Sequence, residues 1–337
     1  MKMCTRTHRP VFLLGLLAGV AVLLLAGAPG FSYLPDFTTP GPQMDRWDFR
    51  AFAVVWNLNP SKGPNINGSR PVADVMQASF NTWTGAPNAV LTISRGADSS
   101  VSTEGASHPG INLICFVCSD TDFSKDDKTL AVTITTASNA VGQSNRHGGT
   151  TTFIGQLIQA DILFNPATIY TTDGTCPSGA TCQDIQTVAT HEIGHFVGLD
   201  HSGVVRSVMS PAASSLLTLG YDDIAGLSVL YPKSPPDVPT GSISGTVTMS
   251  GGGGVFGAHV FAESSTGNTA FGSSIRKTPI GTLTRTDGSY NIQGLPADSY
   301  VVTAEPLDGP VSNSDVSGYP SAFGQAAVQT TFTTRWH

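Results

Sequence analysis

The first half of the chain combines short β-branched segments with segments of helical period. Over residues 71–84, apolar side chains recur at three- and four-residue steps, which predicts a helix. A second helix is predicted over residues 184–197, with Asp184 as its N-cap, and a short third helix over residues 222–230. Strands are predicted from β-branched content over residues 50–58, 91–94, 111–117, 129–136 and 155–164. The first half is therefore expected to mix strands and helices.

The pattern changes after a proline-rich segment. Residues 233–239 hold three prolines and no apolar period, so they predict a linker that few contacts cross. Beyond it, residues 241–249 alternate apolar and polar positions, and an Asp-Gly pair at residues 287–288 predicts a tight hairpin turn. Residues 240–312 therefore predict a small all-β sandwich. The tail, residues 313–337, shows no clear pattern and stays unassigned.

Composition and charge narrow the class of protein. Of the 337 residues, 40% are hydrophobic and only 12% are charged, which favours a globular chain of about two domains over a disordered one. The net charge is −7, and no basic run occurs outside the N-terminus. Nucleic acid is therefore not expected as a partner.

The N-terminus has the order of a secretory signal. Three basic residues precede an uncharged apolar run over residues 11–28, and the small residues 26–28 offer a cleavage site. Residues 1–28 are therefore expected to be a signal peptide. The run is 18 residues long, which is also the lower bound for a membrane-spanning helix, so an uncleaved anchor is the alternative. Either reading places the rest outside the cytoplasm, secreted or anchored, and a membrane contact is expected only without cleavage. Residues 29–43, rich in proline and glycine, are expected to form an extended lead-in.

Four cysteines lie beyond the targeting segment, and they allow three pairings. Cys176 and Cys182 flank a turn-rich segment and can close a small loop by a disulfide. Cys115 and Cys118 lie in an apolar strand-like run, and a straight strand would hold their Cα atoms about 10 Å apart, beyond disulfide reach. Either the chain turns between them or each pairs elsewhere.

The sequence HEIGHFVGLDH occupies residues 191–201. His191 and His195 are four residues apart on a predicted helix, so both imidazoles project from one face toward one point. Glu192 lies beside the first of them, where a carboxylate can act as the general base on a metal-activated water. This spacing predicts a zinc site with a catalytic glutamate.

Two further residues extend the pattern. Gly198 can adopt positive φ, which ends the helix and turns the chain back. His201 then arrives as a third ligand. Three protein ligands leave a fourth position open, which is the arrangement of catalytic and not of structural zinc. The residues thus indicate a zinc hydrolase with one catalytic ion.

The segment resembles the matrixin branch of the metzincin peptidases. Ser202 follows the third histidine as it does in matrixins, and Met209, in the sequence SVMSP, is similar to the Met-turn of the family. The resemblance covers residues 44–232. It implies an α+β fold, with a twisted mixed sheet, an active-site helix and a Met-turn, and zinc-dependent cleavage of protein or peptide substrates. Met209 would form the floor beneath the imidazoles without ligating.

The chain departs from the family at three positions. Leu163 stands where matrixins of the animal type have a ligand to a second, structural zinc, so that ion is not expected. Asn165 replaces a calcium-binding aspartate, which weakens the case for calcium. Ala213 replaces a bulky tyrosine after the Met-turn, which puts the shape of the pocket beside it in doubt. Within the family frame, the strand over residues 155–164 is expected to be the sheet edge that pairs with a substrate.

The remaining regions carry weaker signals. His108 and His259 stand alone and are interpreted as surface or loop residues. Residues 240–312 resemble the carboxypeptidase-regulatory-like, transthyretin-type β-sandwich, which implies a spacer or binding surface. The alternative function is therefore an inactive protease-like protein for surface binding or adhesion, but the intact catalytic residues argue against it.

Overall fold

The structure, a computed structural model, describes residues 33–336 apart from residues 39–40, 64, 119, 121–122, 124–128, 212–215 and 268. The expected signal or anchor over residues 1–28 and the departure at Ala213 both lie outside the described residues. In the described part, no helix has the length and apolar character that a membrane crossing requires.

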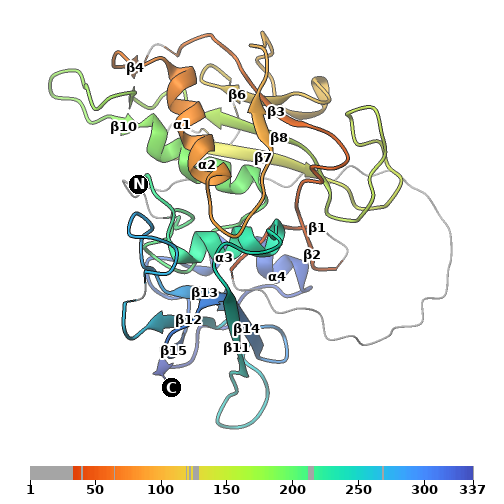
Figure 1. Ribbon diagram of the computed structural model, residues 1–337, viewed down its shortest axis with the longest axis vertical. Coiled ribbons are helices and arrows are strands. Elements are labelled where there is room, and N and C mark those ends of the chain that lie inside the picture. Colours follow the sequence, from red (N-terminus) through yellow and green to blue (C-terminus); the bar gives the residue numbers. More distant parts are fainter. Residues whose placement is uncertain are drawn as a thin grey trace.

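The first half of the chain is built on a five-stranded mixed sheet with the order β5-β3-β6-β8-β7 (Figure 1). Its strands are β3 (Val54–Leu58), β5 (Ile93–Arg95), β6 (Asn112–Cys115), β7 (Ala131–Ala137) and β8 (Leu157–Phe164). Only the β7–β8 pair is antiparallel, and the other three pairs are parallel. This mixture of helices and a mixed sheet is consistent with the α+β fold of a matrixin catalytic domain.

The position of β8 corrects one expectation. All eight residues of β8 are buried, and the strand pairs with β6 on one side and with β7 on the other. The prediction that this strand forms the sheet edge is therefore wrong. Among the described strands, β7 is the edge strand next to β8. Its residues 131–137 pair antiparallel with β8 and so cover that strand.

Two helices pack against each other and position the rest of this half. These are α1 (Val72–Thr84), which was predicted from its apolar period, and α2 (Ile185–Phe196), which was predicted with Asp184 as its N-cap. Phe80 of α1 stacks on Trp56 of β3 with ring centroids 5.1 Å apart, and it meets Phe196 of α2 edge-on. Since α2 also contacts β7 and β8, it is fixed between α1 and the sheet.

Short elements complete the first half. They are β1 (Phe37–Thr38), β2 (Gln43–Met44), β4 (Ile66–Asn67), the 3₁₀ turn η1 (Gly105–Ser107), β9 (Tyr170–Thr171) and β10 (Gln183–Asp184). The described part of the expected lead-in is extended and packs on the first half: Asp36 N donates to Gly198 O at 2.9 Å, and Asp200 N donates to Leu34 O at 2.8 Å. Residues 33–38 therefore run along the chain that leads to His201.

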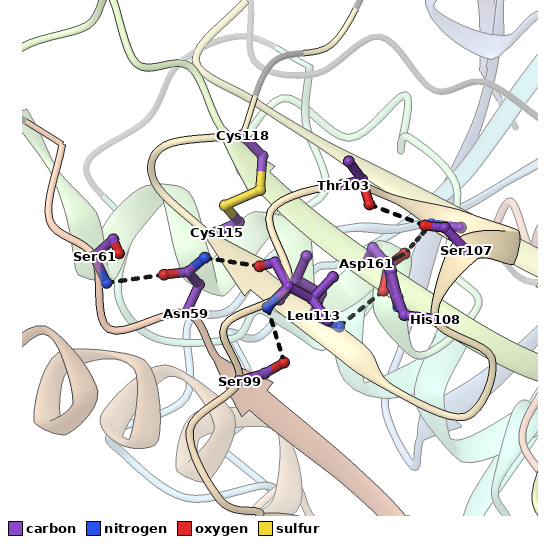
Figure 2. Close-up of a disulfide and its surroundings, with 12 residues drawn as sticks. Asn59, Ser61, Ser99, Thr103, Ser107, His108, Leu113, Cys115, Cys118 and Asp161 are labelled. Carbon is purple, nitrogen blue, oxygen red and sulfur yellow. Dashed lines mark hydrogen bonds and ion pairs between the residues drawn. A yellow bond between two sulfur atoms is a disulfide. The ribbon is translucent and has the colours of Figure 1, made fainter.

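The chain turns sharply at the end of β6, where Cys115 and Cys118 form a disulfide with Cα atoms 5.7 Å apart (Figure 2). Of the two alternatives left open by the sequence, the turn is therefore the one observed. Nearby, Asp161 of β8 accepts hydrogen bonds from Leu113 N and Gly105 N, each at 2.8 Å.

His108 belongs to the same buried region. Its Nε2 lies 3.6 Å from Asp161 Oδ2 (Figure 2), and its side chain is 3% exposed. His259 is also buried, and its Nδ1 lies 3.0 Å from Glu305 Oε1. His108 does lie in a loop, just after η1, but it is buried and not on the surface. For His259, which lies in the strand β12, the interpretation as a surface or loop residue is wrong.

The second half contains two antiparallel sheets. One pairs β11 (Thr240–Thr246) with β14 (Ser289–Pro296), and the other has the order β13-β12-β15-β16. The strands of the second are β12 (His259–Ser264), β13 (Ile280–Leu283), β15 (Tyr300–Glu305) and β16 (Arg335–Trp336). The tail left unassigned by the sequence forms the 3₁₀ turn η2 (Asn313–Val316), the short helix α4 (Gly318–Ala322) and β16.

The helix α3 (Tyr221–Leu230) joins the two halves (Figure 1). Eight of its ten residues are buried, because it packs on the first half and also on β13 and β14. A single hydrophobic cluster contains Ile224 and Leu227 of α3 together with Ile292 of β14. The expectation that few contacts cross the linker is therefore wrong: the proline-rich segment is short and exposed, but the elements on both sides of it share a core.

Candidate metal centre

The helix α2 begins at a side-chain cap and carries the first two candidate ligands. Asp184 Oδ1 accepts a hydrogen bond from Thr187 N at 2.8 Å, which satisfies one of the free N–H groups of the first turn. Two residues earlier, Cys182 forms a disulfide with Cys176, with Cα atoms 5.9 Å apart. About two and three turns into the helix, His191 and His195 project from the same face, with ring centroids 4.9 Å apart.

Gly198 turns the chain toward the third histidine. Its φ of +94° lies in the left-handed region, and a Cβ at this position would collide with the carbonyl oxygen of Asp45. Both features require glycine. After this turn, the ring of His201 lies 4.9 Å from that of His195 and 5.3 Å from that of His191, measured between centroids.

The three histidines converge on one point. Their ligating nitrogens all lie within 4.8 Å of one another, and no other group of this kind occurs among the residues that the structure describes. The Nε2 atoms of His191 and His201 are buried and make no hydrogen bond. A buried polar atom without a partner is costly, so a bound cation would relieve this cost. The residues fit a tetrahedral zinc ion with an open fourth position.

Backbone carbonyls orient all three rings. The Nδ1 atoms of His191, His195 and His201 lie 2.7, 2.7 and 2.8 Å from the carbonyl oxygens of Val208, Leu199 and Asp315, respectively. Because a carbonyl oxygen can only accept, each Nδ1 carries the proton and each Nε2 keeps its lone pair. Each ring is thus held as the tautomer that can bind a metal.

Burial favours the neutral form of the first ligand. It lowers the pKa of His191 to about 3, and the nearby His201 adds a smaller effect in the same direction. At neutral pH the imidazole of His191 is therefore uncharged, as a metal ligand must be.

Glu192, which follows His191 in α2, is fully buried and is held by the last strand of the sheet. Thr133 of β7 donates from Oγ1 to Glu192 Oε2 at 2.7 Å. The same hydroxyl also lies 3.1 Å from the backbone oxygen of Glu192. Thr133 lies in a predicted strand, but its spacing gave no sign of this contact, which joins residues 59 positions apart.

Met209 lies directly beneath the ligand-bearing face of α2. A Cβ on Gly194, between the two helical histidines, would collide with the Met209 sulfur. The turn that carries Met209 is held by Asp223 of α3, which accepts hydrogen bonds from Ser207 Oγ and from Val208 N. Since the carbonyl of Val208 orients His191, Asp223 supports that ligand indirectly.

Asp222, the neighbour of Asp223, was also missed by the sequence reasoning. Its Oδ2 accepts from Ser202 Oγ at 2.5 Å, and its Oδ1 accepts from Gly281 N of β13 at 2.8 Å. Burial first, and the charge of Asp223 second, raise the pKa of Asp222 to about 7. The adjacent acidic pair in the sequence was the only signal, and it did not indicate which residues each carboxyl would contact.

Leu163 and Asn165, the two departures from the further metal sites of the family, make contacts of other kinds. Leu163 is fully buried in an apolar cluster with Leu113, Val132 and Ile134. Asn165 uses its side chain for local hydrogen bonds, donating to Thr129 O and accepting from Ala167 N, each at 2.9 Å. In the structure both side chains therefore serve packing and turn formation.

Comparison with known proteins gives the class of the matching segment. Residues 123–232, about a third of the chain, match the family model described as Matrixin, a family of peptidases. The range includes all three histidines, Glu192 and Met209. This match supports a metalloprotease over that range.

Individual relatives agree with the family match. The chain is 41% identical over 76 residues to Metalloendoproteinase 5-MMP of Arabidopsis thaliana, which is 22% of this chain and 21% of that protein. It is 52% identical over 50 residues to Matrilysin of Rattus norvegicus, which is 14% of this chain and 19% of that protein. It is 43% identical over 61 residues to Stromelysin-3 of Xenopus laevis, covering 13% of that protein. The chain thus spans about a fifth or less of the length of these curated relatives.

Proposed function

We propose that this protein is an exported zinc-dependent metalloendopeptidase that hydrolyses peptide bonds of extracellular proteins or peptides. The observation that carries the proposal is the convergence of His191, His195 and His201, each oriented by a backbone carbonyl, beside the buried carboxylate of Glu192. Export is proposed because the N-terminal residues have the order of a secretory signal.

The three histidines would hold one zinc ion through Nε2. Zinc at this point would supply Lewis-acid chemistry, polarising the scissile carbonyl and activating a water at neutral pH. Glu192 acts as the general base: its carboxylate accepts the proton of the attacking water and then delivers it to the leaving nitrogen. Thr133 keeps one oxygen of that carboxylate fixed, and Met209 supports the histidines from below without ligating.

The substrate would lie along β7. This strand ends the order of the described sheet on the side of α2, and its Thr133 already contacts Glu192. An extended peptide that pairs with a terminal strand gains backbone hydrogen bonds and sets its side chains alternately up and down. β7 therefore replaces β8 as the strand proposed to bind the substrate.

The domain division is proposed with one change from the sequence reasoning. Residues 44–232 form the peptidase part, and residues 240–312 form a β-sandwich of the transthyretin type, supported by two antiparallel sheets that contact each other through β12, β13 and β14. The proline-rich residues 233–239 connect them. The shared core makes the sandwich an integral part of the molecule and not a detached module.

The test compares wild-type protein with Glu192→Ala, using metal analysis and cleavage of a peptide library. We expect one zinc per chain in both proteins and a loss of about 10²- to 10⁴-fold in cleavage by the variant, because a positioned base contributes that much. Glu263→Ala, at an exposed position of β12, serves as the control and should cleave normally. Zinc binding without any cleavage by wild type would favour the alternative, an inactive surface-binding protein.

A further inference from the structure

The third candidate ligand is oriented by the far end of the chain. The carbonyls that hold His191 and His195 come from residues 17 and 4 positions away, within the peptidase part. The carbonyl that holds His201 belongs to Asp315, which lies 114 residues later in the turn η2. The local sequence around the motif therefore supplies the orientation of two ligands but not of the third.

The carbonyl of Asp315 is itself held firmly. The side-chain carboxylate oxygen Oδ2 of Asp315 accepts hydrogen bonds from Ser312 N at 2.8 Å and from Ser312 Oγ at 2.6 Å. These bonds cap the start of η2. Val316, the next residue, is fully buried in an apolar cluster with Phe256 and Leu283 of the second half. The position of the carbonyl thus depends on the packing of this cluster, which consists of second-half residues apart from Leu34 and Phe37.

The helix α4, which follows η2, also lies close to Asp200, the residue before His201. Tyr319 of α4 lies with its hydroxyl 3.2 Å from both Leu283 O and Thr284 O, which anchors α4 to the strand β13 and the residue after it. At the start of α4, a Cβ on Gly318 would lie 3.0 Å from Asp200 Oδ2. Asp200 in turn accepts from His201 N at 2.7 Å.

A second link acts from the other side of His201. Ser202 donates to Asp222, and the other oxygen of Asp222 accepts from Gly281 N of β13. The residues before and after His201 therefore both contact groups that are fixed by the second half. His201 is held between them, with its Nδ1 directed at Asp315.

We propose that Asp315 is a positioning residue for the third zinc ligand, and that the second half of the chain controls how tightly the metal is held. The inference rests on the proposed function, since it concerns the same three histidines. A hydrogen-bonded partner fixes the tautomer and the orientation of a ligating histidine, and losing such a partner costs about 10- to 100-fold in metal affinity. The second half thereby completes the metal site.

The test uses the full chain with single substitutions and measures zinc affinity by competition with a chelator. Asp315→Ala removes the cap that fixes the carbonyl, so we expect the zinc Kd to rise about tenfold, at the lower end of the range for an outer partner. Asp315→Asn keeps an oxygen that accepts from Ser312 and should bind zinc nearly as wild type does. Rescue by asparagine separates positioning from charge.

A matched control keeps the comparison specific. Asp298 also accepts hydrogen bonds from hydroxyls of the second half, those of Ser264 and Thr266. Asp298→Ala therefore removes a similar interaction without touching η2, and its zinc Kd should equal that of wild type. The melting temperature of each zinc-free protein is measured alongside, and Asp315→Ala should differ little from Asp298→Ala in it.

A second variant approaches the same contact from α4. Gly318→Val adds bulk against Asp200, so it should separate α4 from the chain before His201 and also raise the zinc Kd. If both Asp315→Ala and Gly318→Val bind zinc as wild type does, the inference is overturned while the proposed function stands. If wild type itself retains no zinc, the proposed function is overturned and the inference with it.

Discussion

Thr133 on β7 donates a hydrogen bond of 2.7 Å to Oε2 of Glu192 on α2. The bond joins the last strand of the sheet to the carboxylate beside the three histidines. Because β7 is also the strand proposed to pair with substrate, the position of the base and the position of the substrate depend on the same strand. A change at Thr133 should therefore affect chemistry without affecting metal content.

Thr133→Val removes this donor while keeping the size and branching of the side chain. We expect kcat to fall about 10- to 150-fold, because a hydrogen bond to a charged group contributes about 1.5–3 kcal/mol. Zinc content should stay at that of wild type, since no ligand contacts Thr133. The control is Thr136→Val, whose side chain points to the other face of the same strand. An unchanged kcat in Thr133→Val would show that Glu192 is oriented without this bond.

The metal content should be one zinc ion per chain. Leu163, where a second ligand would stand, has a side chain without a lone pair and is fully buried among aliphatic side chains and the Cys115–Cys118 disulfide. Anomalous scattering from crystals of the zinc-loaded protein should show a single strong site at His191, His195 and His201. A second tightly held ion within ligand distance of residue 163 would contradict this prediction.

A chain that ends at residue 232 should not fold as the full chain does. The truncation exposes the face of α3 that carries Ile224 and Leu227, which pack in one cluster with Ile292. We expect the truncated chain to lose its cooperative thermal transition. Circular dichroism during heating measures this. As a control, a chain ending at residue 332 loses only β16, whose Trp336 is 76% exposed, and should melt as the full chain does. A cooperative transition in the shorter chain would restore the independence that the linker suggested.

Replacing both Cys176 and Cys182 by serine should lower the free energy of unfolding by about 2 kcal/mol. This is the loss of loop-closure entropy expected for so short a loop. Peptide mapping without reduction should link residue 176 to 182 and residue 115 to 118, as the structure does. A fragment that joins one pair to the other would contradict both the pairing and the stability estimate.

Asp222 should make the stability of the zinc-free protein depend on pH. Burial and Asp223 raise its pKa to about 7, above the ordinary value of 3.8. A carboxyl whose pKa is raised by folding binds its proton more tightly in the folded state. Its contribution is thus fully present below pH 4 and is lost as the pH rises through 7. The contribution of Asp222 to the free energy of unfolding therefore falls by at most about 4 kcal/mol between about pH 4 and pH 7.

The measurement is the free energy of unfolding by urea between pH 4 and pH 8. Asp222→Asn cannot ionise, so its stability relative to wild type should rise with pH over this range. Two other groups titrate in both proteins: burial raises the pKa of Asp161 to about 6, which lowers stability as the pH rises, and lowers the pKa of His191 to about 3, which raises stability up to the ordinary histidine pKa of 6.5. Equal slopes for wild type and Asp222→Asn would show that Asp222 does not titrate in this range.

Features that depend on neighbouring residues could be predicted from the sequence. The helix α1 follows from its apolar period, and the common face of His191 and His195 follows from a spacing of four on a helix. Gly198 could be assigned to a turn because only glycine adopts its φ without strain. In each case the physical cause lies within one or two turns of chain, so the local sequence contains it.

Features that depend on distant residues were decided by the tertiary structure. The sequence did not reveal that β8 lies inside the sheet, that Thr133 contacts Glu192, or that Asp315 orients His201. The reason is that strand order and side-chain partners are set by the packing of segments that lie up to 114 residues apart, and local periodicity carries no record of that packing. The sequence alone thus predicted which residues meet at the candidate metal centre, and the tertiary structure decided what holds them there.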